Sequence, residues 1–320
     1  MTTVKRALLV GVDRYANFSN LDGCVNDVCA LEPLLDGNDD DTPNFACQKL
    51  TTESGDVTRN GLIGGLDALL AGGADVALVY FAGHGIGTAT DVTLATEDGT
   101  SVTPGVAFSE LLTRITSSTV GEVIVILDCC FAGAAGGIPQ LGVTAAALRE
   151  GVSILAASRA DELSAETDTG RGLFSTFLQG GLEGGAADVL GRVTIAGLYS
   201  YLDESFDPWQ QRPVFKANVD RLHELRRCKP AVPLDQLRRI TEFFAEPDEV
   251  LALDPSYEPA ADPSDPAHEA IFEILQEYRA AKLLEPVGAA HMYFAAMQSA
   301  GCRLTPLGRH YHHMTRDRRF

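Results

Sequence analysis

Several features are scarce in this sequence of 320 residues, and each scarcity argues against a class of protein. No apolar run approaches the roughly 18 residues that a membrane-spanning helix needs. Lys and Arg number 25 against 44 Asp and Glu, which gives a formal net charge of −19. That balance disfavours general nucleic-acid binding, which requires a basic surface, and suits a protein that receives basic partners or substrates.

Cysteine is sparse as well, and its pattern argues against disulfides and zinc. The cysteines number seven, and no two of them form a Cys-x-x-Cys pair. This fits a compartment that keeps thiols reduced, and no zinc site is predicted. The first residues, MTTVKRALLV, lack the apolar core and the small-residue cleavage site of a signal peptide. We therefore expect a cytoplasmic protein.

The first two thirds of the sequence alternate apolar runs with helical patterns. The apolar runs cover residues 7–12, 76–82, 123–127 and 152–157. Each run is continuous and bounded by Gly, Asp or Ser, as strands buried on both faces of a parallel sheet are. Helices are expected at 24–35, 58–70, 107–116, 174–182 and 194–204, and a last strand at 212–218. The alternation predicts an α/β fold with a mostly parallel sheet between helices.

The composition changes near Pro230. Residues 240–278 contain eleven Asp or Glu and no Lys or Arg, and three Asp-Pro pairs follow Leu253. Because proline disfavours helix interiors and central strands, we predict an acidic, proline-rich linker over residues 231–267. The domains would then be 1–230 and a small C-terminal domain, 268–320, with helices at 268–282 and 289–299.

Reactive side chains follow two of the predicted strands. His84 lies in a Gly-His-Gly sequence after one apolar run, and Asp128 and Cys130 follow another. In an open α/β sheet, sites form at the carboxyl ends of the strands. If the two strands are neighbours, the imidazole and the thiol meet there, and the thiol gains thiolate character. Taken singly, each residue has a structural alternative, as a buried thiol or as a hydrogen-bonded loop histidine.

These residues stand in motifs that resemble a known family. YFAGHG is followed by DCCFAG, with Cys130 46 residues after His84. Together with ALLVGVDRY, LDGCVNDV, LAASRADELSAE, GLFSTFLQGGL and QQRPVF, they resemble the caspase-like cysteine peptidases of clan CD, and the metacaspase and bacterial caspase-like branch best. The resemblance runs from Arg6 to about Asn218 and implies a caspase-like fold with cysteine endopeptidase activity.

The resemblance also implies roles for single residues. Cys130 would be the nucleophile and His84 its base, while the N–H groups of Gly85 and Cys130 would bind the oxyanion. Cys129 falls on a variable position, so packing is its preferred role. The family usually has His-Ser-Gly after the nucleophile, whereas this chain has Phe-Ala-Gly at 131–133. This departure removes polar groups beside the cysteine but keeps the dyad.

In metacaspases, acidic residues line the pocket for P1, the residue before the scissile bond. The matching residues are Asp128 and, in the motif Gly-Cys-Val-Asn-Asp, Cys24 and Asp27. Two carboxylates would hold a Lys or Arg side chain through charge-assisted hydrogen bonds, so we predict cleavage after Arg or Lys. Caspases that cut after Asp carry an arginine where this chain has Leu-Asp at 21–22. The structural alternative puts Asp27 on a solvated helix face and makes Asp128 a turn cap.

Two further features bear on regulation. Residues 134–150 match a mobile loop that some relatives cut during maturation, and Arg149 is its only basic residue. Self-cleavage after Arg149 is therefore a hypothesis. Some metacaspases require calcium, and Asp91, Glu97 and Asp98 offer hard oxygen ligands without EF-hand spacing. A solvated acidic loop explains them better, and a calcium requirement is left open.

The sequence CRLTPLGRHYHHM, which begins at Cys302, resembles the wing of winged helix-turn-helix domains, where Leu-Thr-x-x-Gly closes a β-hairpin. Such domains can bind DNA, but the helix expected at 289–299 contains no Lys or Arg. A protein contact or a regulatory role is therefore favoured over nucleic acid. His310, His312 and His313 suggest a metal site less well than they suggest surface or packing histidines.

Two classes of function follow from these observations. The leading interpretation is a cysteine endopeptidase acting on protein or peptide substrates with a basic P1 residue. The resemblance implies a regulated effector of bacterial stress or antiviral defence, switched on by a partner protein or a small-molecule signal at the C-terminal domain. The alternative is a catalytically silent scaffold that binds partners through that domain. The presence of both His84 and Cys130 favours the enzyme.

Overall fold

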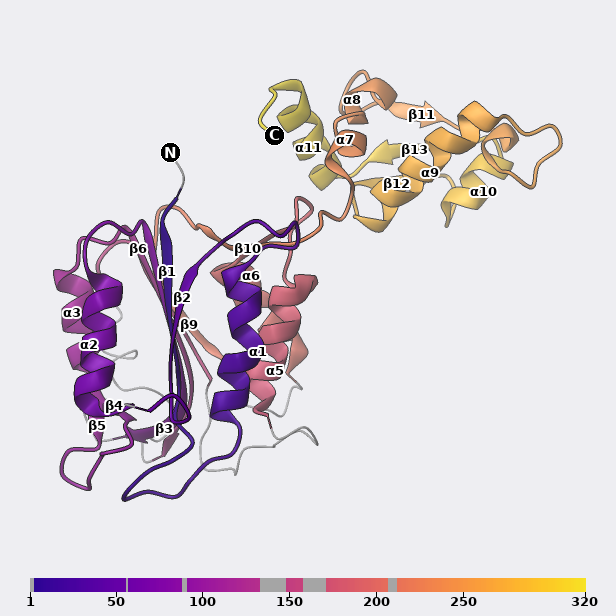
Figure 1. The fold of residues 1–320 in the computed structure, drawn as a ribbon. Coiled ribbons are helices and arrows are strands. Elements are labelled where there is room, and N and C mark those ends of the chain that lie inside the picture. Colours follow the sequence, from indigo (N-terminus) through magenta and orange to yellow (C-terminus); the bar gives the residue numbers. More distant parts are fainter. Residues whose placement is uncertain (1–2, 56, 88–90, 133–147, 158–170, 207–211) are drawn as a thin grey trace. The chain divides into compact units, whose positions relative to one another are not determined.

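The structure is a computed structural model that describes residues 3–55, 57–87, 91–132, 148–157, 171–206 and 212–320, with the backbone alone for residues 130–132. The chain forms two compact units (Figure 1). The first unit contains Met1–Ala187 and Arg192–Cys228, and the second contains Asp188–Gly191 and Lys229–Phe320. Each unit has its own hydrophobic core.

The first unit is built on a mostly parallel sheet. Its main strands are β1 (Lys5–Gly11), β2 (Ala46–Thr51), β3 (Val76–Gly87), β6 (Glu122–Ala132), β7 (Val152–Ala156) and β9 (Val214–Asn218). They lie in the order β2-β1-β3-β6-β7-β9, and only the last pair, β7 and β9, is antiparallel. The predicted α/β fold is thereby confirmed, and every predicted apolar run lies at least mainly within a strand.

Helices cover both faces of this sheet (Figure 1). One face carries α2 (Arg59–Leu70) and α3 (Phe108–Ser117), and the other carries α1 (Cys24–Asp36), α5 (Leu173–Gly180) and α6 (Ile195–Ser205). The π-helical turn η2 (Gly181–Gly185) follows α5, and β8 (Arg192–Thr194) pairs with β10 (Glu224–Arg227) in a separate antiparallel ribbon. The helices predicted in this unit are therefore confirmed, with ends that differ by a few residues.

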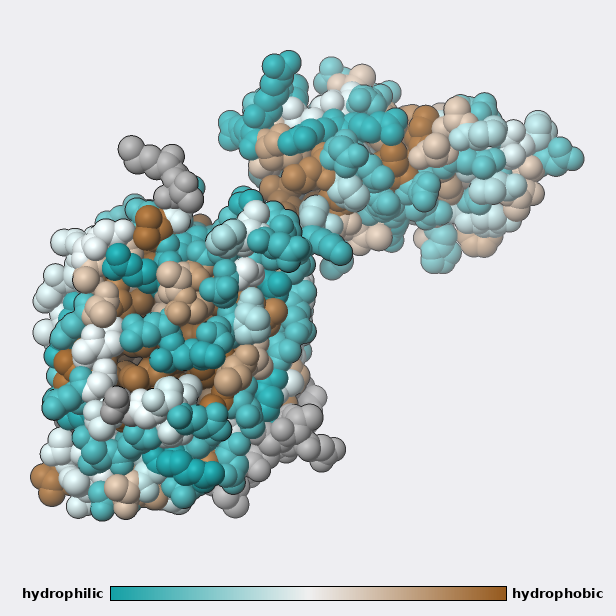
Figure 2. All heavy atoms as spheres, viewed as in Figure 1, coloured by the Kyte–Doolittle hydropathy of each residue, from teal (hydrophilic) through white to brown (hydrophobic). Residues whose placement is uncertain are grey.

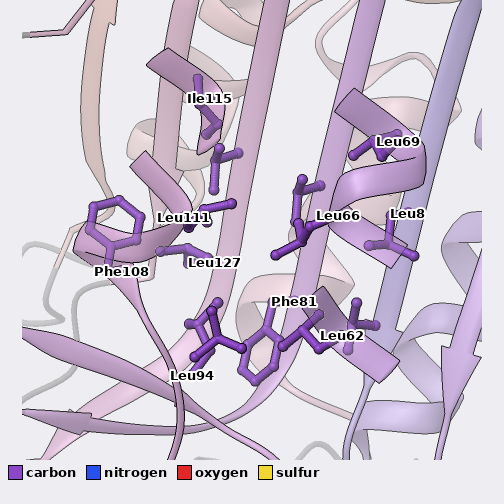
Figure 3. Close-up of a cluster of buried hydrophobic side chains, with 14 of the residues drawn as sticks. Leu8, Leu62, Leu66, Leu69, Phe81, Leu94, Phe108, Leu111, Ile115 and Leu127 are labelled. Atoms are coloured by element: carbon purple, nitrogen blue, oxygen red, sulfur yellow. The ribbon is translucent and has the colours of Figure 1, made fainter. Parts of the chain in front are cut away.

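The two faces are packed by alternate residues of the same strands. In β1, Leu8 and Val10 join the core under α2 and α3, whereas Ala7 and Leu9 join the core under α1, α5 and α6. Figure 3 shows the first of these cores, in which leucines of α2 and α3 meet side chains of β1, β3 and β6. Burial on both faces explains why these strands are continuously apolar, since each large apolar side chain contributes about 1.5–3 kcal/mol.

The two reactive strands are longer than the sequence predicts. Their apolar runs end at Ala82 and Leu127, but β3 continues to Gly87 and β6 to Ala132. Over Gly85–Gly87, β3 also pairs with β4 (Val92–Ala95), which pairs with β5 (Gly105–Ala107), both in antiparallel fashion. The reactive motifs therefore lie within paired strands, where the backbone of the neighbour fixes their position.

The second unit combines helices with a three-stranded sheet. Its helices are α7 (Leu234–Leu237), α8 (Ile240–Phe243), η3 (Pro255–Tyr257), α9 (Pro266–Ala280), α10 (Met292–Met297) and α11 (Pro306–Arg316). The strands β11 (Val250–Ala252), β13 (Gly301–Leu304) and β12 (Leu284–Val287) pair in that order, antiparallel. The helices predicted at 268–282 and 289–299 correspond to α9 and α10.

The structure contradicts the linker predicted at 231–267. This segment contains α7, α8, β11 and η3, and it contributes Ile240, Phe244 and Leu253 to the core of the second unit. Two of its Asp-Pro pairs begin helices. Asp254 caps η3 and Asp265 caps α9, each with proline at the first helical position, where the missing N–H costs nothing. Two of the prolines that suggested an irregular segment are therefore helix starts.

The predicted wing is also wrong. Thr305 accepts a hydrogen bond from the Gly308 N–H at 3.1 Å and begins α11, with Pro306 at its first position. Gly308 is required for packing rather than for a hairpin, because a Cβ there would lie 1.9 Å from the Leu283 carbonyl oxygen. The sequence CRLTPLGRHYHHM thus forms strand β13 followed by a helix, and a winged helix-turn-helix is not supported.

Hydrophilic residues cover much of the viewed surface, with smaller hydrophobic patches between them (Figure 2). In the part of the chain that the structure describes, no helix combines the length and the apolar character needed to cross a bilayer.

Candidate active site

The backbone brings the two candidate dyad residues together. In the parallel pair of β3 and β6, His84 is in register with Cys130, and Gly85 with Phe131. Adjacent strands lie about 4.8 Å apart, so His84 and Cys130 are direct neighbours across the pair. The expectation that the two reactive strands are sheet neighbours is confirmed. The Cys130 side chain and residues 134–147 lie outside the described residues.

Hydrogen bonds fix the orientation of the His84 ring. Its Nε2 lies 2.8 Å from the Ser19 carbonyl oxygen and 3.3 Å from the Ser19 hydroxyl. A carbonyl oxygen only accepts, so Nε2 carries the proton of the neutral ring and Nδ1 keeps its lone pair. A ring held in this tautomer can take a proton at Nδ1, as a general base must.

Tyr15 supports His84 from the backbone side. Its hydroxyl accepts the His84 backbone N–H at 2.8 Å, and the two rings lie 4.8 Å apart between centroids. Gly83 makes this approach possible, because a Cβ at that position would lie 2.7 Å from the Tyr15 hydroxyl. Burial raises the pKa of Tyr15, which therefore stays protonated. The glycine before the histidine thus admits the tyrosine.

Asp128 lies within β6, two residues before Cys130, and is half-buried. The Tyr80 hydroxyl donates a hydrogen bond to Asp128 Oδ2 at 3.2 Å. Tyr80 is fully buried, and this burial, together with nearby negative charge, raises its pKa and keeps it a donor. Asp128 is therefore a strand residue in a hydrogen-bonded position, and the alternative in which it caps a turn does not apply.

Asp27 is buried in the first turn of α1, with only 3% of its surface exposed. The alternative of a solvated helix face is therefore wrong. Arg171 Nε donates to Asp27 Oδ1 at 2.9 Å. Burial raises the pKa of Asp27, and hydrogen bonds from Ser175, Arg171 and the Gly172 N–H counteract part of that effect. The charge of the Asp27 carboxylate therefore depends on these hydrogen-bond donors, which oppose the effect of burial.

The two candidate P1 carboxylates converge at Gly172. A Cβ built on this glycine would lie 3.5 Å from Asp27 Oδ2 and 3.5 Å from Asp128 Oδ2. The two oxygens are therefore no farther apart than twice that distance, although the residues come from α1 and β6. The fold therefore brings together the two carboxylates that the sequence analysis assigns to one pocket.

Cys24 begins α1 and is buried beside the same carboxylates. Burial raises the pKa of its thiol, and the negative charges of Asp13, Asp128 and Asp27 raise it further. Asp13 caps the helix, because its two oxygens accept the N–H groups of Cys24 and Val25 at 2.9 and 3.2 Å. Cys24 therefore contributes a neutral wall to the site rather than a nucleophile.

Sequence reasoning missed several residues that position this site. Tyr15 stands in a motif that suggested the family, but nothing in that motif indicates its contact with His84. Ser19 acts through its backbone carbonyl as well as its hydroxyl, so its residue type carries little signal. Arg171 contacts a carboxylate 144 positions away, and only the folded chain shows that contact.

Arg149 lies near the C-terminal end of residues 134–150, the segment that matches a mobile loop of some relatives. Its guanidinium donates to the carbonyl oxygens of Ile115, Val120 and Glu150 at 2.7–2.9 Å. Burial lowers its pKa. Self-cleavage after Arg149 would require these three hydrogen bonds to break, so the structure offers this hypothesis no support.

The carboxylates considered for calcium are used by the protein. Asp91 accepts from the Ser109 hydroxyl, Glu97 from the Val57 N–H, and Asp98 from the Thr96 hydroxyl. His312, in the second unit, is buried and donates from Nε2 to the Phe244 carbonyl oxygen at 2.8 Å, as a packing histidine does. Among the described residues, no group of three or more His, Cys, Asp or Glu could hold a metal ion.

The model of the caspase domain, a peptidase family, matches residues 4–219, which is more than half of the chain. The chain belongs to the caspase family. Membership implies cysteine-type peptidase activity on protein substrates, and the mostly parallel sheet between helices is the corresponding fold. No protein with a curated description matches the chain.

Two solved structures resemble this caspase-family chain. One is a protein from Geobacter sulfurreducens, with 18% identity and a TM-score of 0.46, covering 66% of this chain and 92% of that one. The other is caspase-1 from Spodoptera frugiperda, with 12% identity and a TM-score of 0.49, covering 71% and 91%.

Proposed function

We propose that this caspase-family protein is a cysteine endopeptidase that cleaves after Arg or Lys, with Cys130 as nucleophile and His84 as base. One observation carries the proposal: His84 is in register with Cys130, and its Nε2 is bound to the Ser19 carbonyl, which leaves Nδ1 available. A histidine in this state can accept the thiol proton and generate a thiolate.

The proposed reaction has two stages. The Cys130 sulfur forms a bond to the scissile carbonyl carbon, while the oxygen becomes an oxyanion that backbone N–H groups such as those of Gly85 and Cys130 would stabilise. His84 then gives its proton to the leaving amine as the C–N bond breaks. Water, deprotonated by His84, attacks the thioester, and the thiol leaves as the acid product is released.

The preference for a basic P1 residue is supported by the two carboxylates at Gly172. Asp27 and Asp128 direct oxygens to one point, and a guanidinium can bridge two carboxylates through its several N–H groups. Arg is favoured over Lys on this ground, because an ammonium is a point charge that matches such a pair less well.

Regulation forms part of the proposal. A peptidase that cuts after residues as common as Arg and Lys needs control, and the chain carries a second unit with its own core. On the resemblance to bacterial caspase-like effectors, we assign to that unit the reception of a partner protein or a small-molecule signal, in stress or antiviral defence.

Fluorogenic peptides with Arg, Lys, Asp or Ala at P1 test the proposal, each assayed with and without calcium. Hydrolysis after Arg and Lys is expected, and Cys130→Ala and His84→Ala should each abolish it. Hydrolysis after Asp would refute the P1 assignment while keeping the peptidase. Folded protein that cleaves none of the peptides would mean either the scaffold alternative or a missing activator of the second unit.

A further inference from the structure

Arg171 lies against the candidate P1 pocket, although no motif points to it. Its Nε donates to Asp27 Oδ1 at 2.9 Å, and 16% and 4% of the two side chains are exposed. Its Nη1 donates to Gln179 Oε1, and Gln179 Nε2 donates in turn to Glu183 Oε1 at 2.6 Å. The guanidinium is therefore fixed along α5, with Asp27 of α1 on one side.

The direction of the Arg171 side chain matters for its role. Gln179 lies about two turns along α5 from the start of that helix, so the guanidinium extends along the helix. Arg171 thus occupies Oδ1 of Asp27, whereas Oδ2 faces the point at Gly172 where Asp128 Oδ2 also converges. Arg171 binds one oxygen of Asp27, and the other lies beside Ser175 and Gly172, next to the second carboxylate.

We propose that Arg171 is a positioning residue for P1 specificity, which holds Asp27 by Oδ1 so that Oδ2 is presented, together with Asp128, to a cationic side chain. This inference rests on the proposed function, because it concerns the same pocket. A side chain at position 172 would occupy the point that the two Oδ2 atoms approach, and glycine has none.

The alternative role of Arg171 is that of a substrate mimic filling the pocket. A bound P1 guanidinium would direct its terminal nitrogens to the carboxylates. Arg171 instead contacts Asp27 through Nε and turns Nη1 to Gln179. This geometry is that of a support for the carboxylate.

Arg171 also affects the charge of Asp27. Asp27 faces Asp128 of β6, Tyr80 of β3 and Cys24 of its own helix, and of these Asp128 carries like charge. Burial raises the pKa of Asp27, and the hydrogen bond and positive charge of Arg171 oppose that rise. Without Arg171, Asp27 would bind a proton at higher pH, and the pocket would lose negative charge.

The test compares Arg171→Gln and Arg171→Lys with the wild-type chain and with Arg226→Gln as a matched control. The Arg226 side chain is about as buried as that of Arg171, and it pairs at 2.6 Å with Asp39, a more exposed carboxylate beyond the opposite end of α1. The kcat and KM for peptides with Arg and with Ala at P1 are measured from pH 5 to pH 8. Arg171→Gln should raise KM for the Arg peptide about tenfold or more, because it removes a hydrogen bond to a charged group.

The pH profile separates a positioning role from general damage. In Arg171→Gln, the fall in kcat/KM for the Arg peptide at acid pH should begin at higher pH than in the wild type. The Ala peptide should show no such shift. For the Arg peptide, the pH profile of Arg171→Lys should lie between those of the wild type and Arg171→Gln. Arg226→Gln should leave both profiles unchanged.

A second measurement works without activity. The pKa of the Asp27 carboxyl is followed by 13C NMR in protein labelled at aspartate, with Asp27→Asn to assign the signal. Arg171→Gln should raise this pKa, and Arg226→Gln should not. If the pKa is the same with and without Arg171, the inference is overturned, whether or not any peptide is cleaved.

The two proposals fail in different ways. An Asp27 pKa that rises in Arg171→Gln would support the positioning of Asp27 even in a protein that cleaves nothing, whereas the absence of cleavage would count against the proposed function alone. Cleavage after Arg with an unchanged KM and acid profile in Arg171→Gln would refute the inference alone. Cleavage after Asp that Arg171→Gln abolishes would also refute it, because Arg171 would then bind substrate itself.

Discussion

Two ion pairs, each with a largely buried arginine, lie at opposite ends of α1 and differ in what surrounds them. At the start of the helix, Arg171 holds Asp27 at 2.9 Å, and at the far end Arg226 holds Asp39 at 2.6 Å. Asp27 lies in the first helical turn, where the helix dipole favours negative charge, and Asp39 lies beyond the last turn, where it does not. Of the two, only the first pair meets a second candidate carboxylate, Asp128.

This comparison separates stabilising contacts from contacts that prepare a site. The second pair ties the turn after α1 to β10, away from the reactive residues. The first pair lies at the carboxyl edge of the sheet, where His84 and Cys130 are in register. An arginine–aspartate pair therefore has a structural role beyond the C-terminus of α1. At the N-terminus of α1, such a pair determines the charge available to a ligand.

The largest expected effect is on kcat/KM, when either carboxylate near the N-terminus of α1 is neutralised. Asp27→Asn and Asp128→Asn should each lower kcat/KM for peptides with Arg at P1 by about tenfold to a hundredfold, because each removes a charge-assisted hydrogen bond. The Ala peptide should be far less affected. Equal losses on both peptides would show that the carboxylates do not select P1.

Removing the ion pair beyond the C-terminus of α1 should lower the stability of the protein and leave its activity unchanged. Arg226→Gln leaves Asp39 without its guanidinium, and we expect the free energy of unfolding to fall by about 1–3 kcal/mol. Urea denaturation measures this loss, while kcat/KM stays at the wild-type value. A change in P1 preference would break the distinction between the two ends.

The pH dependence of stability sharpens the comparison further. Burial raises the pKa of Asp27 above that of the unfolded chain, so the folded state binds its proton more tightly. The group therefore contributes stability at acid pH that is lost as pH rises through its folded pKa. The difference in unfolding free energy between wild type and Asp27→Asn should fall between about pH 4 and neutrality. A difference that grows with pH would contradict the sign of the shift.

The smallest effect is expected for an exposed pair. Arg303 and Glu285 lie 2.8 Å apart in the second unit, with about half of each side chain exposed. Arg303→Gln should change the free energy of unfolding by less than about 1 kcal/mol, because solvent screens such pairs. A loss as large as that of Arg226→Gln would show that burial is not what distinguishes these pairs.

Much of the first unit could be predicted from the sequence because its strands are buried on both faces. Runs such as residues 76–82 are continuously apolar, and their glycine, histidine and cysteine ends identify the edge of the sheet where His84 and Cys130 meet. What the sequence could not show are contacts between distant segments. The supports from Tyr15 to His84 and from Arg171 to Asp27 depend on packing alone.

The second unit was misjudged because proline has two meanings. Asp265 followed by proline, and Thr305 followed by proline, are the start of α9 and of α11. The Asp-Pro pairs suggested an irregular linker because proline is also common in loops, and the Leu-Thr-x-x-Gly pattern at 304–308 suggested a hairpin wing. Apolar residues such as Phe244, buried in the core of this unit, were the signal that could have distinguished the two.

The central claim is that Cys130, activated by His84, attacks a bond after a basic residue. Its most direct test is labelling of the full chain with a peptidyl acyloxymethyl ketone carrying Arg at P1, followed by mass spectrometry of the adduct. The account predicts one adduct, on Cys130, which His84→Ala prevents and which an otherwise identical reagent with Asp at P1 does not form. Labelling of the exposed Cys29 instead, or equal labelling of Cys130 in His84→Ala, would contradict the account.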